Sequence, residues 1–399
     1  MRKYILAINA GSSSLKAAIY TSGPNPQRIA SVRVERIGSP EALLTATFEG
    51  RPPQYQSLQA ASHEAALDAV MKHFDTIADA TSLSGVGHRI VHGGPKFTDS
   101  EVITQPMLDE LRRLEPFDPE HLPAQIRIIE VLMQRLPNVR QVACFDTAFH
   151  RDLPPVARRL PIPRRFDSIG VRRYGFHGLS FSYLMDELRR IDAAAADGRV
   201  ILAHLGNGAS LAAVHNGRCI DTSMSFTPSS GLPMGTRSGD LDPGLVQYLV
   251  RNSGLTVEQF NHIVHSESGL LGISETTGDM QQLLELESTD VRAAEAVEIF
   301  CYQVRKWIGA YAAALGGIDT VIFTGGIGER AAEVRARICI GLGFLGIELD
   351  ADLNRAHRLV VSSGRRSVVV RVIVTDEEQV IAGEVNNAGS ETGVSHSLD

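Results

Sequence analysis

The chain has 399 residues, of which 43% are hydrophobic and 21% charged, the balance of an ordinary globular protein. Its length exceeds what a single hydrophobic core usually serves, so two domains are expected. The formal net charge of -7 argues against nucleic acid or an anionic membrane as the main partner, so positive charge for an anionic ligand must be gathered locally.

The N-terminus carries no recognisable targeting segment. Arg2 and Lys3 are followed by only five apolar residues before Asn9, which is too short for a signal peptide. No apolar run reaches the ~18 residues that a membrane-spanning helix needs. We expect a cytoplasmic protein, because its four cysteines form no Cys-x-x-Cys pair and are too widely spread for a disulfide framework: Cys144, Cys219, Cys301 and Cys339.

The first half of the chain begins with a predicted β-hairpin. Two short apolar strands at residues 4–8 and 15–20 flank a Gly/Ser-rich turn at 9–14. Helical spacing of apolar residues and short apolar runs then alternate. They predict a helix at 63–80, a strand at 85–91, a helix at 124–136 and a strand at 139–145.

The second half opens with the same pattern. A strand at 199–205, a turn at 206–210 and a strand at 211–214 repeat the first hairpin about half a chain later, which indicates an internal duplication. The remaining pattern alternates helix and strand, as in α/β proteins. It predicts helices at 243–254 and 292–315, strands at 320–323 and 367–374, and a disordered tail from about residue 386.

Three glycine-rich turns follow predicted strands, at residues 9–14, 206–210 and 325–329. Backbone N–H groups in such turns can cradle phosphate oxygens. A single turn of this kind is most often only a turn, but three in one chain, two of them related by duplication, favour nucleotide binding. None matches the Walker pattern or a full Gly-x-Gly-x-x-Gly, so neither a P-loop nor a dinucleotide fold is predicted.

Polar residues in and near these turns are candidate ligands. In the first turn, the side chains of Asn9, Ser12 and Ser14 can hold phosphate or Mg2+-bound water and Lys16 can neutralise phosphate, although Asn and Ser also favour turns without a ligand. Two arginines, Arg89 and Arg237, lie near glycines and could clamp a phosphoryl group. For each, a solvated surface arginine is the alternative.

Two carboxylates and two histidines complete the candidates. Asp146 and Glu377 follow strands, where α/β proteins place ligands, and either could bind Mg2+. His177 and His204 stand out by their glycine-rich context, although a structural role is an equal alternative for each. No His or Cys spacing supports zinc.

Seven segments, in this order, resemble the acetate kinase family with its propionate and butyrate kinase members, over about residues 4–385. The segments are Ile-Asn-Ala-Gly-Ser-Ser-Ser-Leu-Lys (8–16), His-Arg-Ile-Val-His-Gly-Gly (88–94), Phe-Asp-Thr-Ala-Phe-His (145–150), Tyr-Gly-Phe-His-Gly (174–178), His-Leu-Gly-Asn-Gly (204–208), Met-Gly-Thr-Arg-Ser-Gly-Asp (234–240) and Phe-Thr-Gly-Gly-Ile-Gly-Glu (323–329).

The resemblance implies an α/β fold of two duplicated ribonuclease-H-like domains, of the actin and sugar-kinase type, around a central cleft. It implies an acyl- and phosphoryl-side domain at 1–150 that also takes in about 370–385. A nucleotide-binding and dimerisation domain would span 151–369, and a flexible tail 386–399. It also implies a homodimer, Mg2+ or Mn2+ as the metal, and reversible phosphoryl transfer between ATP and acetate to give ADP and acetyl phosphate.

The family's site residues carry over by motif. Asn9 and Glu377 would hold the metal, while Arg89, Arg237 and His177 would surround the transferring phosphoryl with Asp146 beside them. Arg89 would also contact the substrate, whose acyl pocket would be lined by Val91, Phe176 and Pro228. The nucleotide would be held by Ser12, Ser14, Lys16, His204, Leu205, Gly206, Asn207, Gly208, Asp279, Met280, Gln281, Gly326, Ile327, Gly328 and Glu329.

Two departures from the family pattern bear on specificity. Gln281 stands where the family usually has Arg, which removes a positive contact to the nucleotide. Glu120 falls where an apolar pocket residue is usual, unless the local register places Leu122 there. Nucleotide and acyl-chain preference are the properties that these departures affect.

A carboxylate substrate is already ionised at neutral pH, since its pKa lies near ~4, so no general base is expected. The mechanism favoured is direct in-line transfer with Asp146 aligning the metal or His177; the alternative is a covalent phospho-carboxylate on Glu377. A propionate or butyrate kinase is the nearest rival. A rival of another class is an actin-like ATPase switch, which would not need Arg89, Phe176 and His177.

Overall fold

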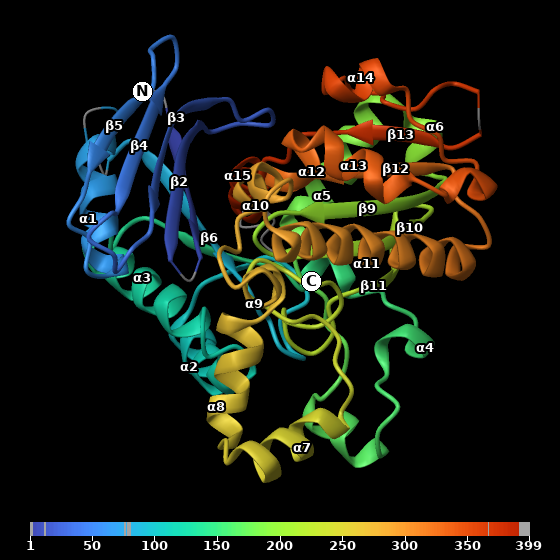
Figure 1. The fold of residues 1–399 in the computed structure, drawn as a ribbon. Coiled ribbons are helices and arrows are strands. Elements are labelled where there is room, and N and C mark those ends of the chain that lie inside the picture. Colours follow the sequence, from blue (N-terminus) through green and yellow to red (C-terminus); the bar gives the residue numbers. More distant parts are fainter. Residues whose placement is uncertain (1–2, 12, 76, 78–80, 366, 391–399) are drawn as a thin grey trace, which may run out of the picture. The chain divides into compact units, whose positions relative to one another are not determined.

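The computed structural model describes residues 3–390 except 12, 76, 78–80 and 366, and it divides into two compact units (Figure 1). Unit 1 comprises the residues up to Ala148 together with the segment from Asp376, and unit 2 comprises Phe149–Thr375. The sequence places the boundaries close by, with a first domain at 1–150 that takes in a late segment. Among the described residues, no helix is long and apolar enough to cross a membrane.

Unit 1 is built on an eight-stranded sheet with the order β5-β4-β3-β2-β1-β6-β8-β7. Its strands are β1 (Tyr4–Ala10), β2 (Ser14–Thr21), β3 (Arg28–Glu35), β4 (Leu43–Phe48), β5 (Gln54–Ser57), β6 (Leu83–Ile90), β7 (Glu101–Val102) and β8 (Gln141–Phe145). Its helices are α1 (His63–Phe74), α2 (Gln105–Leu114), α3 (Leu122–Arg135) and α15 (Glu377–Ser390).

The sheet of unit 1 is covered on both faces because side chains alternate along each strand. On β6, Val86 joins the core that α1 and α3 complete. Its neighbours Gly85 and Gly87 lie against Val385 and Ile381 of α15, where an added Cβ would come within 2.5 and 2.3 Å of the helix side chains. Glycine at these two positions therefore lets α15 approach the sheet closely.

Unit 2 is built on a five-stranded sheet with the order β11-β10-β9-β12-β13. Its strands are β9 (Arg199–Leu205), β10 (Ala209–His215), β11 (Arg218–Thr222), β12 (Thr320–Thr324) and β13 (Val369–Val372). Its helices are α4 (Pro155–Arg158), α5 (Gly178–Ile191), α6 (Ala193–Ala196), α7 (Gly244–Ser253), α8 (Val257–His262), α9 (Gly269–Ser274), α10 (Met280–Leu286), α11 (Val291–Leu315), α12 (Gly325–Arg330), α13 (Ala332–Cys339) and α14 (Ala351–Arg355).

The helices of unit 2 also lie on both faces of its sheet. Phe181, Leu184 and Leu188 of α5 pack in one core cluster with β9, β10 and β12. The long helix α11 crosses the strands and contacts β9 and β10 (Figure 1). Gly316, at φ +70°, ends α11 in the left-handed conformation that the sequence predicts for its stop.

The two sheets confirm the duplication inferred from the sequence. In unit 1, β3, β2 and β1 pair antiparallel, while β1, β6 and β8 pair parallel. In unit 2, β11, β10 and β9 pair antiparallel, while β9, β12 and β13 pair parallel. The same strand order and directions recur, so the predicted hairpins hold equivalent places at the centre of each sheet.

Three sequence predictions about local structure are wrong, and the first is the helix predicted at 63–80, which ends at Phe74. Residues 325–329 do not form an open turn but the first residues of helix α12. The tail predicted from residue 386 is helical as far as Ser390, because α15 continues and Asn386 exchanges hydrogen bonds with Gly23, at 3.2 and 2.8 Å. The rest of the predicted tail, 391–399, lies outside the described residues.

Candidate active site

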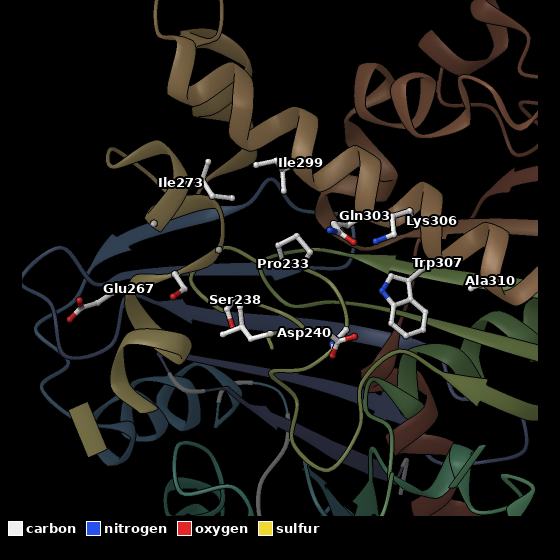
Figure 2. Close-up of a pocket in the computed structure, with 15 residues that line it drawn as sticks. Pro233, Ser238, Asp240, Glu267, Ile273, Ile299, Gln303, Lys306, Trp307 and Ala310 are labelled. Atoms are coloured by element: carbon white, nitrogen blue, oxygen red, sulfur yellow. The ribbon is translucent and has the colours of Figure 1, made fainter. Parts of the chain in front are cut away.

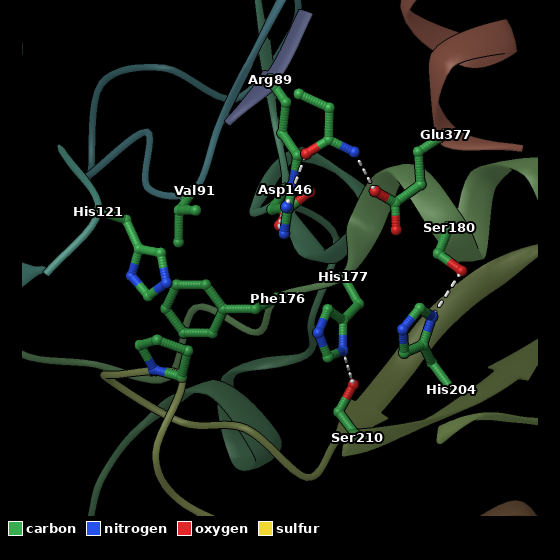
Figure 3. Close-up of polar contacts among 12 residues, drawn as sticks. Arg89, Val91, His121, Asp146, Phe176, His177, Ser180, His204, Ser210 and Glu377 are labelled. Atoms are coloured by element: carbon green, nitrogen blue, oxygen red, sulfur yellow. Dashed lines mark hydrogen bonds and ion pairs between the residues drawn. The ribbon is translucent and has the colours of Figure 1, made fainter. Parts of the chain in front are cut away.

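In unit 1, the carboxyl ends of the parallel strands β1, β6 and β8 gather polar side chains at one edge of the sheet. Arg89 donates from Nε and Nη2 to Asp146 Oδ2, at 3.0 and 2.6 Å, and from Nη1 to Asn9 Oδ1, at 3.0 Å. Asn9 Nδ2 then donates to Glu377 Oε2 at 2.8 Å, and Figure 3 shows Glu377 beside Arg89 and Asp146. Asn9 Nδ2 also donates to Glu378 Oε1 at 3.1 Å. One continuous network thus joins four of the residues expected from the sequence, Asn9, Arg89, Asp146 and Glu377.

The guanidinium of Arg89 is held in its charged form. Burial lowers its pKa, but the carboxylates of Asp146 and Glu377 raise it more, and the pKa ends above its ordinary value. The Asp146 side chain is only 1% exposed and that of Arg89 16%. Arg89 is therefore a positioned cation, and Asp146 is the group that positions it.

The start of α15 places two adjacent carboxylates, Glu377 and Glu378, around the amide of Asn9. Hard anionic oxygens are the ligands that Mg2+ prefers, and Mg2+ typically takes one or two protein carboxylates beside waters and phosphate oxygens. The carboxylate oxygens of Glu377 and Glu378 are therefore suitable ligands for Mg2+. Asn9 is less directly suited, because its amide oxygen accepts from Arg89.

A second network holds the α15 start in place. Tyr20 donates its hydroxyl proton to Asp376 Oδ1 at 2.9 Å and accepts from Arg28 Nε at 3.1 Å, while Arg28 forms an ion pair with Asp376. Asp376 also accepts from Gln379 N at 3.0 Å and so caps the helix. The sequence reading missed Tyr20 and Asp376; the run 375–378 contained the only signal.

The other predicted residues of unit 1 lie near this edge. Gln125 of α3 accepts from Val91 N at 3.0 Å and donates to Ala10 O at 2.9 Å, which ties the expected acyl residue to the end of β1. Ser14 and Lys16 lie at the start of β2, half-buried, and Ser12 lies outside the described residues. Gln125 was not foreseen, since a single glutamine in a helix carries no motif.

Glu120 and Leu122, the two candidates for the pocket position, differ in burial. Glu120 is exposed, whereas Leu122 is buried in the core of unit 1. His121 between them is 9% exposed and its Nδ1 lies 2.9 Å from Asp118 Oδ1. Within unit 1 the acidic side chain of Glu120 is therefore at the surface, while Leu122 packs in the core.

In unit 2, His177 and His204 lie together, each held by a serine. His177 Nδ1 is 2.9 Å from Ser210 Oγ, and His204 Nδ1 is 2.9 Å from Ser180 Oγ (Figure 3). The two imidazole rings stack, with centroids 4.2 Å apart. Ser180 and Ser210 were missed at the sequence level, because serine is too common to be singled out without its partner.

Because Gly208 has no side chain, the imidazole of His177 and the guanidinium of Arg237 can both approach it. A Cβ at Gly208 would lie 3.3 Å from His177 Nε2 and 3.6 Å from Arg237 Nη1, so both groups converge over this glycine. Arg237 Nη1 also donates to Pro228 O at 3.0 Å. His177, Arg237 and Pro228, predicted separately from the sequence, therefore belong to one cluster.

The segments that carry the expected nucleotide residues adjoin one another within unit 2. The turn 206–208 lies beside the start of α12, since a Cβ on Gly206 would be 3.8 Å from Gly326 N. The loop 234–237 packs on the same turn through the hydrogen bond from Gly235 N to Asn207 O, 3.0 Å. Gly278 in turn lies against Gly235, so that 278–281 adjoins this loop. Leu205, Ile327, Gly328 and Met280 lie within these segments.

Two acidic residues of these segments already have structural partners. Glu329 Oε1 accepts from Thr324 Oγ1, Gly325 N and Thr375 N, at 3.1, 3.0 and 3.2 Å. Asp279 Oδ1 accepts from the N–H groups of Gln281 and Gln282, at 2.8 and 3.1 Å, and caps α10. Each carboxylate therefore shapes its loop, whatever it does toward a nucleotide.

A cavity of about 650 Å3 opens beside the Arg237 loop, between residues 231–241, α9 and α11. Figure 2 shows Gln303, Lys306 and Trp307 on the α11 side and Pro233 and Asp240 on the loop side. Trp307, the only tryptophan of the chain, lines this cavity and packs against Tyr311.

Comparison with known proteins identifies the family. Residues 4–383 match the acetokinase family. The chain belongs to this family. An acetate kinase of Staphylococcus aureus strain JH9 is 40% identical over 400 residues, which cover 98% of this chain and 99% of the relative. The resemblance to acetate kinases drawn from the seven motifs is thereby confirmed.

Solved structures of acetokinase-family proteins share the fold. A Porphyromonas gingivalis acetate kinase matches with a TM-score of 0.86 and 35% identity, covering 97% of this chain and 99% of that one. A propionate kinase of Francisella tularensis matches with a TM-score of 0.89 and 34% identity, covering 96% and 99%. The predicted fold class, two duplicated α/β domains of this kinase type, is confirmed.

Proposed function

We propose that this chain is an acetate kinase, which reversibly transfers the terminal phosphoryl group of ATP to acetate and forms acetyl phosphate and ADP. The observation that carries the proposal is the family match over residues 4–383, with relatives named acetate kinase at 40% identity over nearly their whole length. The arrangement of Arg89, Asp146 and Asn9 in unit 1 and of His177 and Arg237 in unit 2 supports it.

The chemistry requires two anions to meet. An oxygen of the ionised carboxylate attacks the γ-phosphorus, the bond from that phosphorus to the ADP oxygen breaks, and ADP leaves with the electron pair. No proton is transferred, so the site needs positive charge and alignment rather than a base. We assign that charge to Arg89 and Arg237, with His177 as a further donor to the phosphoryl oxygens.

Asp146 has a more specific role in this proposal than alignment of the metal or of His177. Both of its contacts to Arg89 come from one carboxylate oxygen, and these two bonds fix the plane of the guanidinium. We therefore propose that Asp146 positions Arg89. Direct in-line transfer remains the proposed route, with Glu377 as a metal-side carboxylate.

Mg2+, when bound, would neutralise part of the negative charge of the phosphates. We propose that Glu377 and Glu378 hold it, with Asn9 orienting them from Nδ2, and that Mn2+ can take its place. ATP and ADP would be bound by the unit 2 surface of residues 204–208, 278–281 and 325–329, and by Ser14 and Lys16 of unit 1. Gln281 is exposed there and cannot supply the charge of an arginine.

Acetate is proposed over longer acids, with propionate as the second candidate because a propionate kinase shares the fold at a TM-score of 0.89. Val91 of unit 1 and Phe176 and Pro228 of unit 2 are the proposed acyl-binding residues. One methylene changes binding by about 1–3 kcal/mol, so the preference will be graded.

The test is acyl phosphate formation from ATP and Mg2+, trapped as hydroxamate, with acetate, propionate and butyrate in parallel. We expect the highest kcat/KM with acetate. A longer acid giving the highest kcat/KM would change the substrate but leave the reaction. ATP hydrolysis that no carboxylate stimulates would contradict the proposal and favour a switch ATPase of actin type.

We also propose a cytoplasmic homodimer. All four cysteines lie in the described part of the chain and are buried and free, which suits a reducing compartment. In unit 2 the described helices α7 and α8 contain no buried residue, and the large apolar side chains of Tyr248 and Val257 on them are 62% and 61% exposed. Such an apolar surface is typical of a contact with a second copy.

Sedimentation velocity of Tyr248→Arg beside the unchanged protein tests this interface. We expect a dimer for the unchanged chain and a dissociated species for the variant, because a buried arginine without a partner disfavours association. Gln54→Arg, an exposed change on β5 of unit 1 that adds the same single charge away from α7 and α8, is the control. A variant that stays dimeric at micromolar concentration would place the interface elsewhere.

A further inference from the structure

The chain contains a buried histidine that no part of the proposed mechanism uses. His150 is 2% exposed, its Nε2 lies 3.0 Å from the carbonyl oxygen of Phe176, and its Nδ1 lies 3.1 Å from Cys219 Sγ. A carbonyl oxygen can only accept, so Nε2 carries the proton and donates it. Nδ1 is then the acceptor that faces the thiol.

The environment keeps this imidazole neutral. Burial lowers the pKa of His150 to about 4, with a smaller lowering from Arg173, against the raising effect of the bond to Phe176. At neutral pH the ring therefore has one N–H, and that N–H points at a single backbone carbonyl. The tautomer is fixed by the structure and not by solution chemistry.

The carbonyl that His150 holds lies in the middle of a strained turn. Gly175 has φ +79° and His177 has φ +58°, so left-handed residues stand on both sides of Phe176. For a residue other than glycine this conformation is unfavourable and persists only when neighbouring groups enforce it. His177 therefore needs external support for the backbone that presents its side chain.

His150 also supports the turn from below. A Cβ on Gly175 would lie 2.5 Å from His150 Cδ2, so the imidazole ring packs directly against that glycine. In the same turn, the N–H groups of Tyr174 and Gly175 donate to Ser225 O at 2.9 and 3.3 Å. The imidazole ring and Ser225 together hold the backbone immediately before Phe176.

We propose that His150 is a positioning residue, whose Nε2–H holds the Phe176 carbonyl and thereby sets the turn that presents the Phe176 and His177 side chains to substrate. This inference rests on the proposed function, in which Phe176 lines the acyl pocket and His177 faces the phosphoryl group. One buried hydrogen bond then governs both acyl fit and phosphoryl alignment, while nucleotide binding is left to other segments.

Two substitutions separate the hydrogen bond from the mere presence of a histidine. His150→Gln places an amide N–H as many bonds from the backbone as Nε2, so it can still reach Phe176 O. His150→Asn places its amide nitrogen at the distance of Nδ1, which is too short to reach. The pair has similar polarity and differs in the one contact that matters.

We expect His150→Asn to raise the KM for acetate by about 10-fold and to lower kcat, as loss of one buried hydrogen bond allows. The ratio of kcat/KM between acetate and propionate should shift, and the KM for ATP should not. His150→Gln should restore all values to within about 3-fold. Leu188→Ala, a buried change near the far end of α5, is the control and should alter thermal stability without altering the acyl ratio.

Three results would overturn the inference: an acyl ratio and acetate KM unchanged in His150→Asn, equal damage in the Gln and Asn variants, or a parallel rise in the KM for ATP. If His150→Asn does not fold, Gly175→Ala tests the same turn, because its Cβ displaces the ring. The Ala variant should show the same rise in acetate KM, and normal kinetics there would count against the proposal.

Phe176→Ala distinguishes this inference from the function on which it rests. If that variant leaves the acyl ratio unchanged, the proposed acyl pocket is wrong. If Phe176→Ala changes the ratio and His150→Asn does not, the pocket stands and only the role of His150 is refuted.

Discussion

Removing Arg89 should impair both catalysis and stability, because the same side chain serves both. Arg89→Ala deletes three hydrogen bonds and leaves the carboxylate of Asp146, 1% exposed, without its cation. Breaking such a buried pair destabilises a protein by about 3–5 kcal/mol. The lost arginine should also lower kcat by ~10³–10⁵, with a much smaller rise in KM.

The double variant Arg89→Met/Asp146→Leu resolves the two effects. It removes both charges and fills the space with apolar atoms, so the free energy of unfolding should return to within about 2 kcal/mol of the unchanged protein. Activity should not return, because no cation faces the phosphoryl group. Urea unfolding and the hydroxamate assay measure the two quantities on the same samples.

Either of two results would refute the reasoning. A kcat within about 10-fold of the unchanged enzyme in Arg89→Ala would remove Arg89 from the chemistry. A double variant that regains activity along with stability would show that Arg89 only neutralises Asp146. Arg33→Ala, which loses an exposed arginine of the same unit, is the control for a change in net charge.

Three further predictions follow from buried groups. Burial lowers the pKa of His88 and of His150 to about 4, so both side chains stay neutral in the native protein while the same histidines of the unfolded chain take up protons below about pH 6.5. The free energy of unfolding, at its full value above pH 6.5, should therefore fall by about 3 kcal/mol per histidine as the pH drops to 4. Urea midpoints at pH 7, 5.5 and 4.5 that do not decline would contradict this. Tyr20→Phe removes the hydroxyl that donates to Asp376, so we expect the free energy of unfolding to fall by about 1–3 kcal/mol and the Mg2+ concentration for half-maximal rate to rise. An unchanged Mg2+ titration would show that the start of α15 does not depend on this contact. Arg335 is 0% exposed and donates to the carbonyls of Gly328 and Glu329 at 2.8 and 3.0 Å. Arg335→Met should therefore raise the KM for ATP several-fold and leave the KM for acetate unchanged. Equal rises in both KM values would indicate general unfolding instead.

The elements with strong periodicity were predictable from the sequence. The hairpins β1–β2 and β9–β10 and the helix α11 appear within a few residues of their predicted bounds, because apolar spacing and glycine stops are local signals. The helix predicted at 63–80 ends at Phe74, and 325–329 proves helical. Both errors arise where glycine or polar content competes with tertiary packing.

The candidate residues were found by motif, but their partners were not. Arg89 meets Asn9 and Asp146 across 80 and 57 residues, and Asn9 meets Glu377 across 368. Such separations are set by the strand order of the sheet and leave no trace in local spacing. For the same reason Glu378, Ser180 and Ser210 were not singled out, since each is an ordinary residue until its partner is known.

The amide of Asn9 keeps opposite charges apart. It accepts from the guanidinium of Arg89 on one side and donates to the carboxylate of Glu377 on the other, so a neutral dipole stands where an ion pair would otherwise close. A guanidinium neutralised by Glu377 would have less attraction left for phosphate, and a carboxylate neutralised by Arg89 less for a metal ion. With the amide between them, Arg89 keeps its ion pair with Asp146 without a second, direct ion pair to Glu377, and Glu377 meets a neutral amide instead of a cation. An aspartate at this position would repel Glu377, and a leucine would form neither the hydrogen bond to Arg89 nor the one to Glu377. The separation of these charges in unit 1 therefore depends on a side chain that carries no charge.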